Sequence, residues 1–206
     1  MILEKIKGMI LPGRHIPQIK EVTEDGYWKE RSRPTKSLLK TAELFNSMGG
    51  KIIVEIGSGM HGPLSGNSIL VWAKRTRAKK IFAVDHDTKR IEEVRSVTKR
   101  FGAVAPVLED GLVFIDRFDE MIDLLYLDFW PPEPEGDLWG TGRAHVYLEI
   151  YEKARKKMSV DSLILIDDTD HIPPWKDTLI VPKARKDGFQ VLWIGRQTLL
   201  KRTSTG

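Results

Sequence analysis

Hydrophobic and polar positions follow two alternating periods along the chain. Short apolar runs that end at a glycine or an acidic residue are typical of buried strands. Such runs predict strands over residues 51–56, 80–85, 103–108, 122–128, 162–167, 189–194 and 198–202. Between and before them, apolar residues recur every three or four positions, which indicates helices. These helices are expected over residues 37–45, 65–77, 88–101, 112–118, 144–158 and 178–186.

Strands that alternate with helices favour a mostly parallel sheet with helices on both faces. Too few residues separate the last two strands for a crossover helix, so these two are expected to pair as an antiparallel hairpin. The sequence therefore predicts an α/β fold with a doubly wound, mostly parallel, seven-stranded sheet and a C-terminal antiparallel hairpin.

The beginning of the chain lacks this alternation. Prolines and glycines interrupt residues 1–34, and a single helix follows them. We interpret residues 1–50 as an N-terminal extension that could act as a lid, and residues 51–206 as the domain that holds the sheet.

The composition narrows the classes of function. The 206 residues include no cysteine, which excludes disulfides, thiolate metal ligands and a cysteine nucleophile. The net charge of +4 is small, and the basic runs at 74–80 and 153–157 fall at predicted helix ends, which favour cations, so we expect no nucleic-acid partner. No segment reaches the roughly 20 apolar residues of a membrane span or has the pattern of a signal peptide. We therefore expect no membrane partner and a cytoplasmic location.

The turn after the first predicted strand is rich in glycine. It reads Glu-Ile-Gly-Ser-Gly-Met-His-Gly over residues 55–62. Glycines let the backbone turn sharply and approach a ligand, and a helix N-terminus follows. Ligands of open α/β sheets bind beyond the carboxyl ends of the strands, which makes this turn a candidate site. An ordinary tight connection is the structural alternative.

Acidic residues also end the next two predicted strands. Asp85, followed by His86, suits hydrogen bonds to a pair of ribose hydroxyls. Helix capping is the alternative, and Asp87 fits that role better than Asp85. Asp110, followed by Gly111, could contact a base, although Asp-Gly is also a common turn.

This order of motifs resembles the class I S-adenosylmethionine-dependent methyltransferases. Glu-x-Gly-x-Gly after the first strand, an acid at the end of the second, Asp-Gly after the third and a terminal hairpin occur in that order. The resemblance implies that residues 51–206 form a cofactor-binding methyltransferase domain. It places the methionine at the glycine turn, the ribose at Asp85 and the adenine near Asp110. The implied cofactor-binding residues are Glu55, Gly57, Ser58, Gly59, His61, Asp85, His86, Asp110 and Gly111.

The fourth and fifth predicted strands end in Asp128 and in the pair Asp167-Asp168. If the strands are neighbours, three carboxylates converge, and oxygen ligands of this kind suit Mg²⁺ or Ca²⁺. Helix capping and binding of loop amides are the structural alternatives. The two segments resemble small-molecule O-methyltransferases related to catechol methyltransferases, which hold a metal at such positions. No lysine closely follows Asp128, where that subgroup keeps a catalytic one.

Methyl transfer to an oxygen requires a group that removes a proton. His145 is the preferred general base because it lies at the start of the helix after a long loop, and histidine is the side chain most suited to proton transfer at neutral pH. An unengaged histidine on the helix surface is the alternative. His171 is the second choice, and Asp128 completes the predicted catalytic set.

Three tryptophans, Trp130, Trp139 and Trp175, lie on loops beside the expected cleft. They could stack on a flat acceptor or pack as a lid that excludes water.

These features predict methyl transfer from S-adenosylmethionine to a small-molecule acceptor, with oxygen as the expected nucleophile. A nucleotide-cofactor oxidoreductase of the NAD type is an alternative, because Gly57, Gly59 and Gly62 also fit a dinucleotide fingerprint. A non-catalytic Rossmann-like interaction domain is the other.

Overall fold

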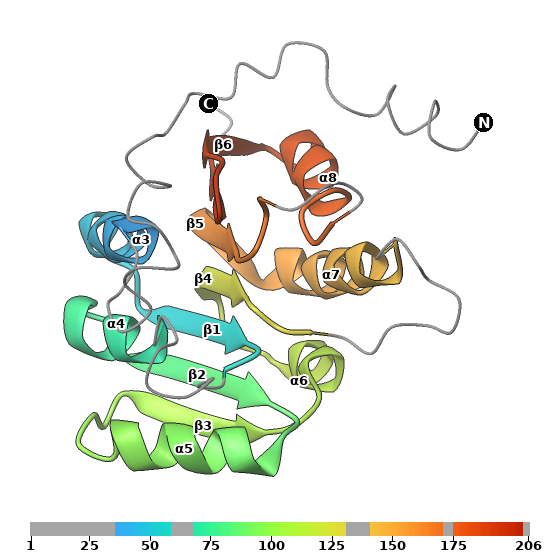
Figure 1. The fold of residues 1–206 in the computed structure, drawn as a ribbon. Coiled ribbons are helices and arrows are strands. Elements are labelled where there is room, and N and C mark those ends of the chain that lie inside the picture. The colour runs from blue at the N-terminus through green and yellow to red at the C-terminus, as the bar shows by residue number, and fades with distance from the viewer. Residues whose placement is uncertain (1–35, 59–67, 131–140, 171–174, 204–206) are drawn as a thin grey trace.

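The computed structural model describes residues 36–58, 68–130, 141–170 and 175–203. Its α-helices are α3 (Lys36–Ser47), α4 (Ser68–Arg75), α5 (Thr88–Thr98), α6 (Gly111–Arg117), α7 (Thr141–Ala154) and α8 (Ile180–Lys186). Its strands are β1 (Ile52–Ile56), β2 (Lys80–Asp85), β3 (Val104–Leu108), β4 (Ile122–Leu127), β5 (Met158–Ile166), β6 (Phe189–Trp193) and β7 (Thr198–Arg202). They alternate along the chain as the sequence predicted (Figure 1).

The strands form one seven-stranded sheet in the order β3-β2-β1-β4-β5-β7-β6. The pairs that join β1 to β2 and β4, β2 to β3, and β4 to β5 are parallel. Strand β7 runs antiparallel to both of its neighbours, β5 and β6. The predicted fold class, including the terminal hairpin, is confirmed.

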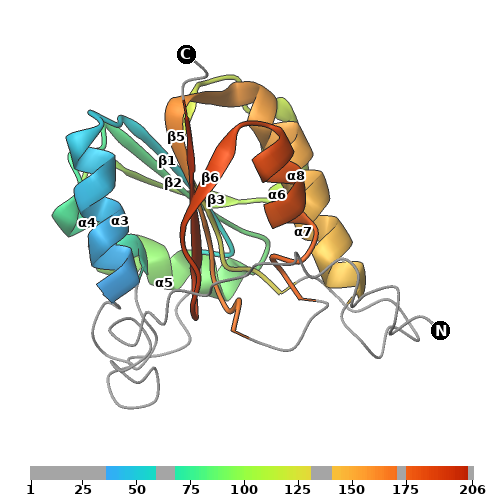
Figure 2. The ribbon, with the colours of Figure 1, turned by 90° about the horizontal axis from the view of Figure 1, so that it is seen from above.

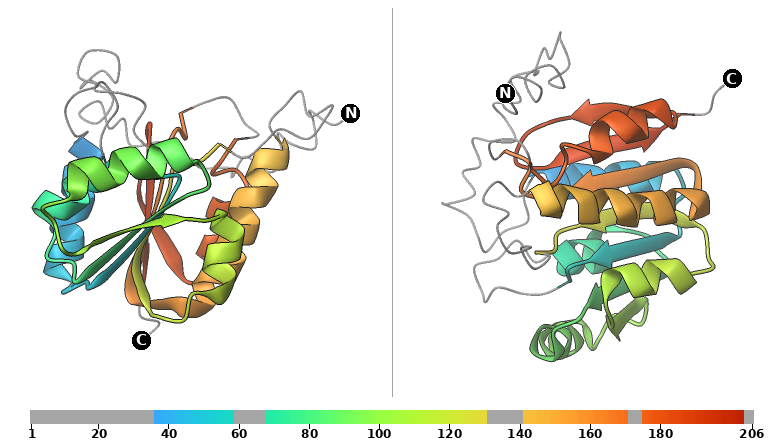
Figure 3. Two further views of the ribbon diagram at one scale, coloured as in Figure 1. Left: turned by 90° about the horizontal axis from the view of Figure 1, so that it is seen from below. Right: turned by 90° about the vertical axis from the view of Figure 1, so that its right-hand side faces the viewer.

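Helices cover both faces of the sheet, and each face has its own hydrophobic core. Helices α3, α4 and α5 lie on one face and α6, α7 and α8 on the other (Figure 2). Figure 3 shows the second group side by side along its face. On the first face, Phe45 and Trp72 pack with Ile53 and Leu124 of the sheet. The parallel strands are mostly apolar because helices cover both of their faces.

The fifth strand begins earlier than predicted, at Met158 in place of residue 162. Its first residues are polar and resemble a loop. Asp161 has a φ of 71°, and the pairing with β4 shifts register between Ile122 and Leu124, so an irregularity interrupts the strand. The helix before it ends at Ala154, with a short 3₁₀ turn before the strand.

Helix α3 is packed into the same core as the sheet. Its Leu38, Ala42 and Phe45 are buried, and the Ser37 hydroxyl donates a hydrogen bond to Oε1 of Gln197, just before β7. Helix α3, the described part of residues 1–50, therefore packs on the sheet. The division into an extension and a domain at residue 50 stays a prediction.

Every helix in the described part of the chain falls short of the length and hydrophobicity needed to span a bilayer.

Gly57 brings the end of β1 against the end of β4. Its φ is +88°, a region that favours glycine, and a Cβ at this position would overlap the backbone carbonyl of Asp128. The N–H groups of Gly57 and Ser58 both donate to the carbonyl of Val84 in β2. The start of the glycine turn, at Gly57 and Ser58, is thus fixed between β2 and β4.

We expect Gly57→Ala to lower the free energy of unfolding by about 2 kcal/mol or more, since the left-handed backbone and the overlap with Asp128 both oppose a side chain. Gly102→Ala is the control, because a Cβ there meets nothing within 4 Å. Its effect should stay within about 1 kcal/mol. Urea unfolding of the two variants measures the difference, and equal stabilities would contradict the described turn.

Candidate functional site

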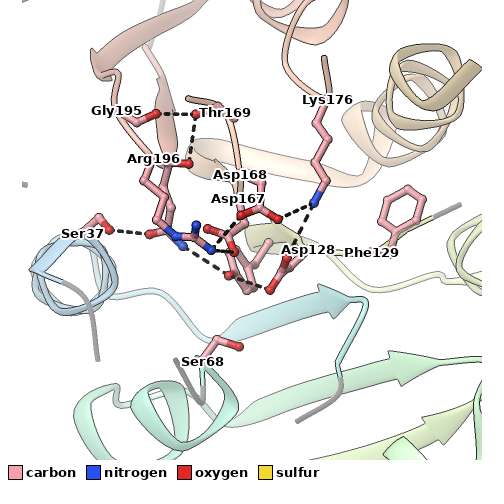
Figure 4. Close-up of polar contacts among 12 residues, drawn as sticks. Ser37, Ser68, Asp128, Phe129, Asp167, Asp168, Thr169, Lys176, Gly195 and Arg196 are labelled. Carbon is pink, nitrogen blue, oxygen red and sulfur yellow. Dashed lines mark hydrogen bonds and ion pairs between the residues drawn. The ribbon is translucent and has the colours of Figure 1, made fainter. Parts of the chain in front are cut away.

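The acidic residues after β4 and β5 lie side by side because their strands are parallel neighbours. The Asp128 N–H donates to the Ile56 carbonyl at 2.9 Å, and the Asp167 N–H donates to the Leu127 carbonyl at 3.0 Å. Each acid is therefore held by the strand beside it. This register brings the predicted acids together at the carboxyl edge of the sheet (Figure 4).

Asp168 directs a third carboxylate to the same place. In a strand, adjacent side chains point to opposite faces. Asp168 leaves this pattern with a φ of 53°, a conformation that aspartate tolerates better than most residues. One oxygen each from Asp128, Asp167 and Asp168 lies within 4.8 Å of the other two. These three residues are called the acid cluster below.

A lysine that the sequence analysis did not single out reaches into the acid cluster. The Lys176 side chain is fully buried, and its Nζ lies 3.1 Å from Oδ2 of Asp168 and 3.8 Å from Oδ1 of Asp128 (Figure 4). The same Nζ lies over the rings of Trp130, at 4.8 Å, and Tyr147, at 5.6 Å. Ion pairs and aromatic faces thus compensate the loss of water around the ammonium.

Arg196 approaches the acid cluster from the connection between β6 and β7. Its Nη2 lies 2.7 Å from Oδ1 of Asp168 and 3.3 Å from Oδ2 of Asp167. The connection is fixed to the segment after β5, because the Thr169 N–H donates to the Arg196 carbonyl and the Thr169 hydroxyl donates to the Gly195 carbonyl. The terminal hairpin therefore carries part of the site.

The charges of the acid cluster affect one another. Burial and the negative charge of Asp167 raise the pKa of Asp128 well above its usual value, and Lys176 opposes that rise. Lys176 and Arg196 thus place two positive charges against the three acids.

The acid cluster meets the distance requirement of a metal site but not its requirement for free ligand oxygens. A divalent cation needs carboxylate oxygens at about 2.0–2.6 Å. Both oxygens of Asp168 already contact protein cations, Oδ1 with Arg196 and Oδ2 with Lys176. Oδ1 of Asp167 is buried and accepts no hydrogen bond from a described residue, which is the feature that favours a metal. The residues do not fit Mg²⁺ or Ca²⁺ as the sequence predicted.

A chain of hydrogen bonds runs from the acid cluster through Tyr126 and Gln197 toward helix α3. The Tyr126 hydroxyl donates to Oδ2 of Asp128 at 3.3 Å and accepts from Nε2 of Gln197 at 3.2 Å. Burial, followed by the charge of Asp128, raises the pKa of Tyr126 well above its ordinary value. Tyr126 therefore acts here as a neutral hydrogen-bonding group.

Two of the predicted tryptophans meet next to the acid cluster. Trp130 and Trp175 pack edge to face with ring centroids 5.7 Å apart. The Arg143 guanidinium lies 4.3 Å from the centroid of Trp130 and 5.2 Å from that of Trp175. Trp130 remains 42% exposed, so it presents an aromatic surface beside Asp128. Trp139 lies outside the described residues.

Glu55 lies buried beneath the glycine turn and is held by helix α4. The Ser68 hydroxyl donates to its Oε1 at 2.9 Å, and the Trp72 indole N–H donates to its Oε2 at 2.6 Å. Burial raises the pKa of Glu55 from 4.5 to about 7, although the hydrogen bonds from Ser68 and Trp72 oppose the rise. Glu55 thus ties β1 to α4 directly under the turn.

The acids after β2 and β3 take different local roles. Asp85 is buried, accepts the Asp87 N–H at 2.9 Å and lies 3.5 Å from Nη1 of Arg90. Asp87 caps α5, as expected. Asp110 caps α6, because its side chain accepts hydrogen bonds from the N–H groups of the second and third helical residues. This carboxylate is therefore engaged by the helix.

The remaining predicted site residues are partly exposed, partly packed and partly outside the described residues. His145 is exposed on α7, whereas the buried residues Ala144 and Tyr147 mark the face of that helix toward the sheet. His86 is exposed beside Asp85. Gly111 packs so closely on Ile56 that a Cβ there would overlap its side chain. Gly59, His61 and His171 lie outside the described residues.

No protein-family model matches the chain, and no curated protein matches it either. Solved structures do share its fold. SAH-bound methyltransferase PaMTH1 from Podospora anserina is 16% identical with a TM-score of 0.60, over 95% of this chain and 98% of that one. A putative caffeoyl-CoA O-methyltransferase from Staphylococcus aureus is 12% identical with a TM-score of 0.59, over 98% and 97%.

An rRNA methylase from Streptococcus thermophilus is 14% identical with a TM-score of 0.55, over 80% of this chain and 95% of that one. At such identities the likeness shows the fold alone, which is the Rossmann-like fold of methyltransferases.

Glu55 predicts a specific dependence of stability on pH. The folded protein binds the Glu55 proton more tightly than the unfolded chain, because the pKa rises from 4.5 to about 7. The resulting stabilisation is complete below the unfolded pKa and is lost as the pH rises through the folded one. Glu55→Gln stays neutral at all these pH values. As the pH rises from about 4.5 to about 8, we therefore expect its free energy of unfolding to increase by roughly 3 kcal/mol relative to that of the wild type.

Glutamine can keep both hydrogen bonds, because its oxygen accepts from Trp72 while its amide donates to the Ser68 hydroxyl. Urea unfolding across this pH range measures the effect. Glu43→Gln is the control, since the Glu43 side chain is 72% exposed. If Glu55→Gln and Glu43→Gln follow the same pH profile, Glu55 titrates as an ordinary carboxyl.

Proposed function

We propose that the protein transfers a methyl group from S-adenosylmethionine to a small-molecule acceptor, with an oxygen as the nucleophile. The observation that carries the proposal is the carboxyl edge of the sheet, where the Gly57 turn lies directly against Asp128 of the acid cluster. A cofactor turn and a set of proton-accepting groups are therefore neighbours. SAH, which is present in one of the similar structures, is the product that S-adenosylmethionine leaves after methyl transfer.

The cofactor is proposed to lie across the ends of β1, β2 and β3. Glu55, Gly57 and Ser58 underlie the turn after β1, with Gly59 and His61 as the sequence-based continuation. Asp85 and His86 are proposed to bind the ribose. Among the described residues, the second oxygen of Asp85 has only the 3.5 Å contact with Arg90, which supports its use as an acceptor.

Asp110 and Gly111 are proposed to border the adenine through the start of α6. Because the Asp110 side chain caps the helix, its contribution there is to shape the loop.

For methyl transfer, the protein must orient an acceptor oxygen and remove its proton. When bound, S-adenosylmethionine supplies a methyl group on a sulfonium, and a neutral thioether leaves. Asp128 is our proposed proton acceptor, because its side chain is 30% exposed, compared with 12% for Asp168 and 7% for Asp167. Its raised pKa also makes it a stronger base. His145 and His171 remain sequence-based candidates for the same role.

A small acceptor is favoured over nucleic acid by the position of the basic residues. Lys74 and Arg75 end α4, and Lys153 lies in the last turn of α7. These helices follow strands β1 and β4, so their C-terminal ends lie at the amino edge of the sheet, opposite the acid cluster. The edge that carries the proposed site presents acids and the exposed Trp130.

The cofactor proposal is tested by calorimetry with S-adenosylmethionine and with NAD. We expect the wild type to bind S-adenosylmethionine and not NAD. Asp85→Asn should weaken the binding of S-adenosylmethionine about tenfold or more, because it removes the negative charge and leaves one accepting oxygen, which the Asp87 N–H already uses. Asp119→Asn, at an exposed position, should bind like the wild type.

Three results would contradict parts of this account. Binding of NAD without S-adenosylmethionine would favour the oxidoreductase, and binding of neither would favour the interaction domain. Unchanged affinity in Asp85→Asn would limit Asp85 to its structural contact with the Asp87 N–H.

A further inference from the structure

Lys176 supplies the acid cluster with a positive charge from within the chain. It comes from the segment after β5, where the Trp175 N–H donates to the Thr178 hydroxyl and the Thr178 N–H donates to the Trp175 carbonyl. This tight turn fixes the lysine at its base. The side chain is fully buried, with its ammonium toward Asp168 and Asp128.

The location of this ammonium conflicts with a divalent cation. The conflict is clearest at Asp168, because Lys176 and Arg196 each contact one of its two carboxylate oxygens. A metal bound by Asp168 would have to displace one of these cations or lie a few ångströms from both. Like charges at such distances in a buried site repel strongly.

The surroundings of Lys176 also suit a permanent cation. The faces of Trp130 and Tyr147 attract an ammonium. Tyr147 is itself fixed, since its hydroxyl donates to the Phe129 carbonyl at 2.7 Å and its ring stacks on Phe129 at 4.2 Å. The lysine is thus enclosed by groups that hold the segment after Asp128.

We propose that the Lys176 ammonium is the resident cation of the acid cluster, in the place where the sequence predicted Mg²⁺ or Ca²⁺. This inference rests on the proposed function for its role, which is to keep Asp128 and Asp168 together at the acceptor side and to supply positive charge beside the acceptor oxygen. Lys176 is a positioning residue in this account. Binding of the methyl donor and methyl transfer then require no added divalent cation.

The experiment measures binding of Mn²⁺ by electron paramagnetic resonance, after the protein has been treated with EDTA. The wild type should leave the signal of free Mn²⁺ unchanged. Lys176→Met, which removes the charge but keeps an apolar chain of similar length, should bind Mn²⁺ at least about tenfold more tightly than the wild type. Lys176→Arg should behave like the wild type because it keeps the charge.

Lys80→Met is the matched control, since it removes an ammonium from an exposed ion pair with Glu120. It should not gain Mn²⁺ binding. The proposal is overturned if the wild type binds Mn²⁺ and Asp167→Ala loses that binding. It is also overturned if folded Lys176→Met gains nothing.

If Lys176→Met does not fold, thermal unfolding of the wild type with and without MgCl₂ decides the matter. An unchanged melting temperature supports the resident ammonium, and a raised one overturns it. None of these readouts needs an acceptor. Failure of S-adenosylmethionine to bind would contradict the proposed function without affecting the Mn²⁺ result, so the two failures are distinguishable.

Discussion

Three carboxylates at adjacent strand ends require positive charge or protons, and much of the structure around the site follows from this requirement. Parallel pairing of β4 with β5 forces Asp128 and Asp167 together, and the left-handed backbone of Asp168 adds a third acid. Uncompensated, such a group would be costly to bury. Lys176 and Arg196 arrive from two different segments and compensate it. Lys176 and the connection between β6 and β7 are thereby held against the acid cluster.

A second set of contacts, through Trp72 and Tyr126, joins the two halves of the proposed active site. On the cofactor side, the Trp72 indole donates to Glu55 beneath the glycine turn. The Trp72 ring packs edge to face on Tyr126 at 5.6 Å, and Tyr126 donates to Asp128 in the acid cluster. Methyl transfer needs a donor and an acceptor held in one geometry. A continuous column of buried groups from Glu55 to Asp128 is well suited to provide it.

The sequence predicted what depends on local pattern. Covered strands are mostly apolar and end abruptly, so β2 and β7 were predicted with their observed bounds. The position of the acids after β4 and β5 followed from the order of the strands. Lys176 and Arg196 could not be predicted in the same way. Each is a single basic residue in a connection, and only the folded path of the backbone brings it to the acid cluster.

Asp110 shows that the sequence could locate a residue at the site without deciding its role. An acid before a glycine at a strand end fits both a ligand and a helix cap, and the two differ only in where the side chain points. The metal prediction failed to anticipate the protein cations for a related reason, since a pattern of acids carries no information about cations that arrive from elsewhere in the chain.

A crystal structure of the protein with SAH, grown in MnCl₂ and measured at the manganese absorption edge, tests the central claim most directly. The account predicts SAH across the Gly57 turn with its sulfur toward Asp128, Lys176 in contact with Asp168, and no anomalous peak among the three acids. A manganese peak bound to Asp128, Asp167 and Asp168 with Lys176 displaced, or SAH bound away from the carboxyl edge of the sheet, would contradict it.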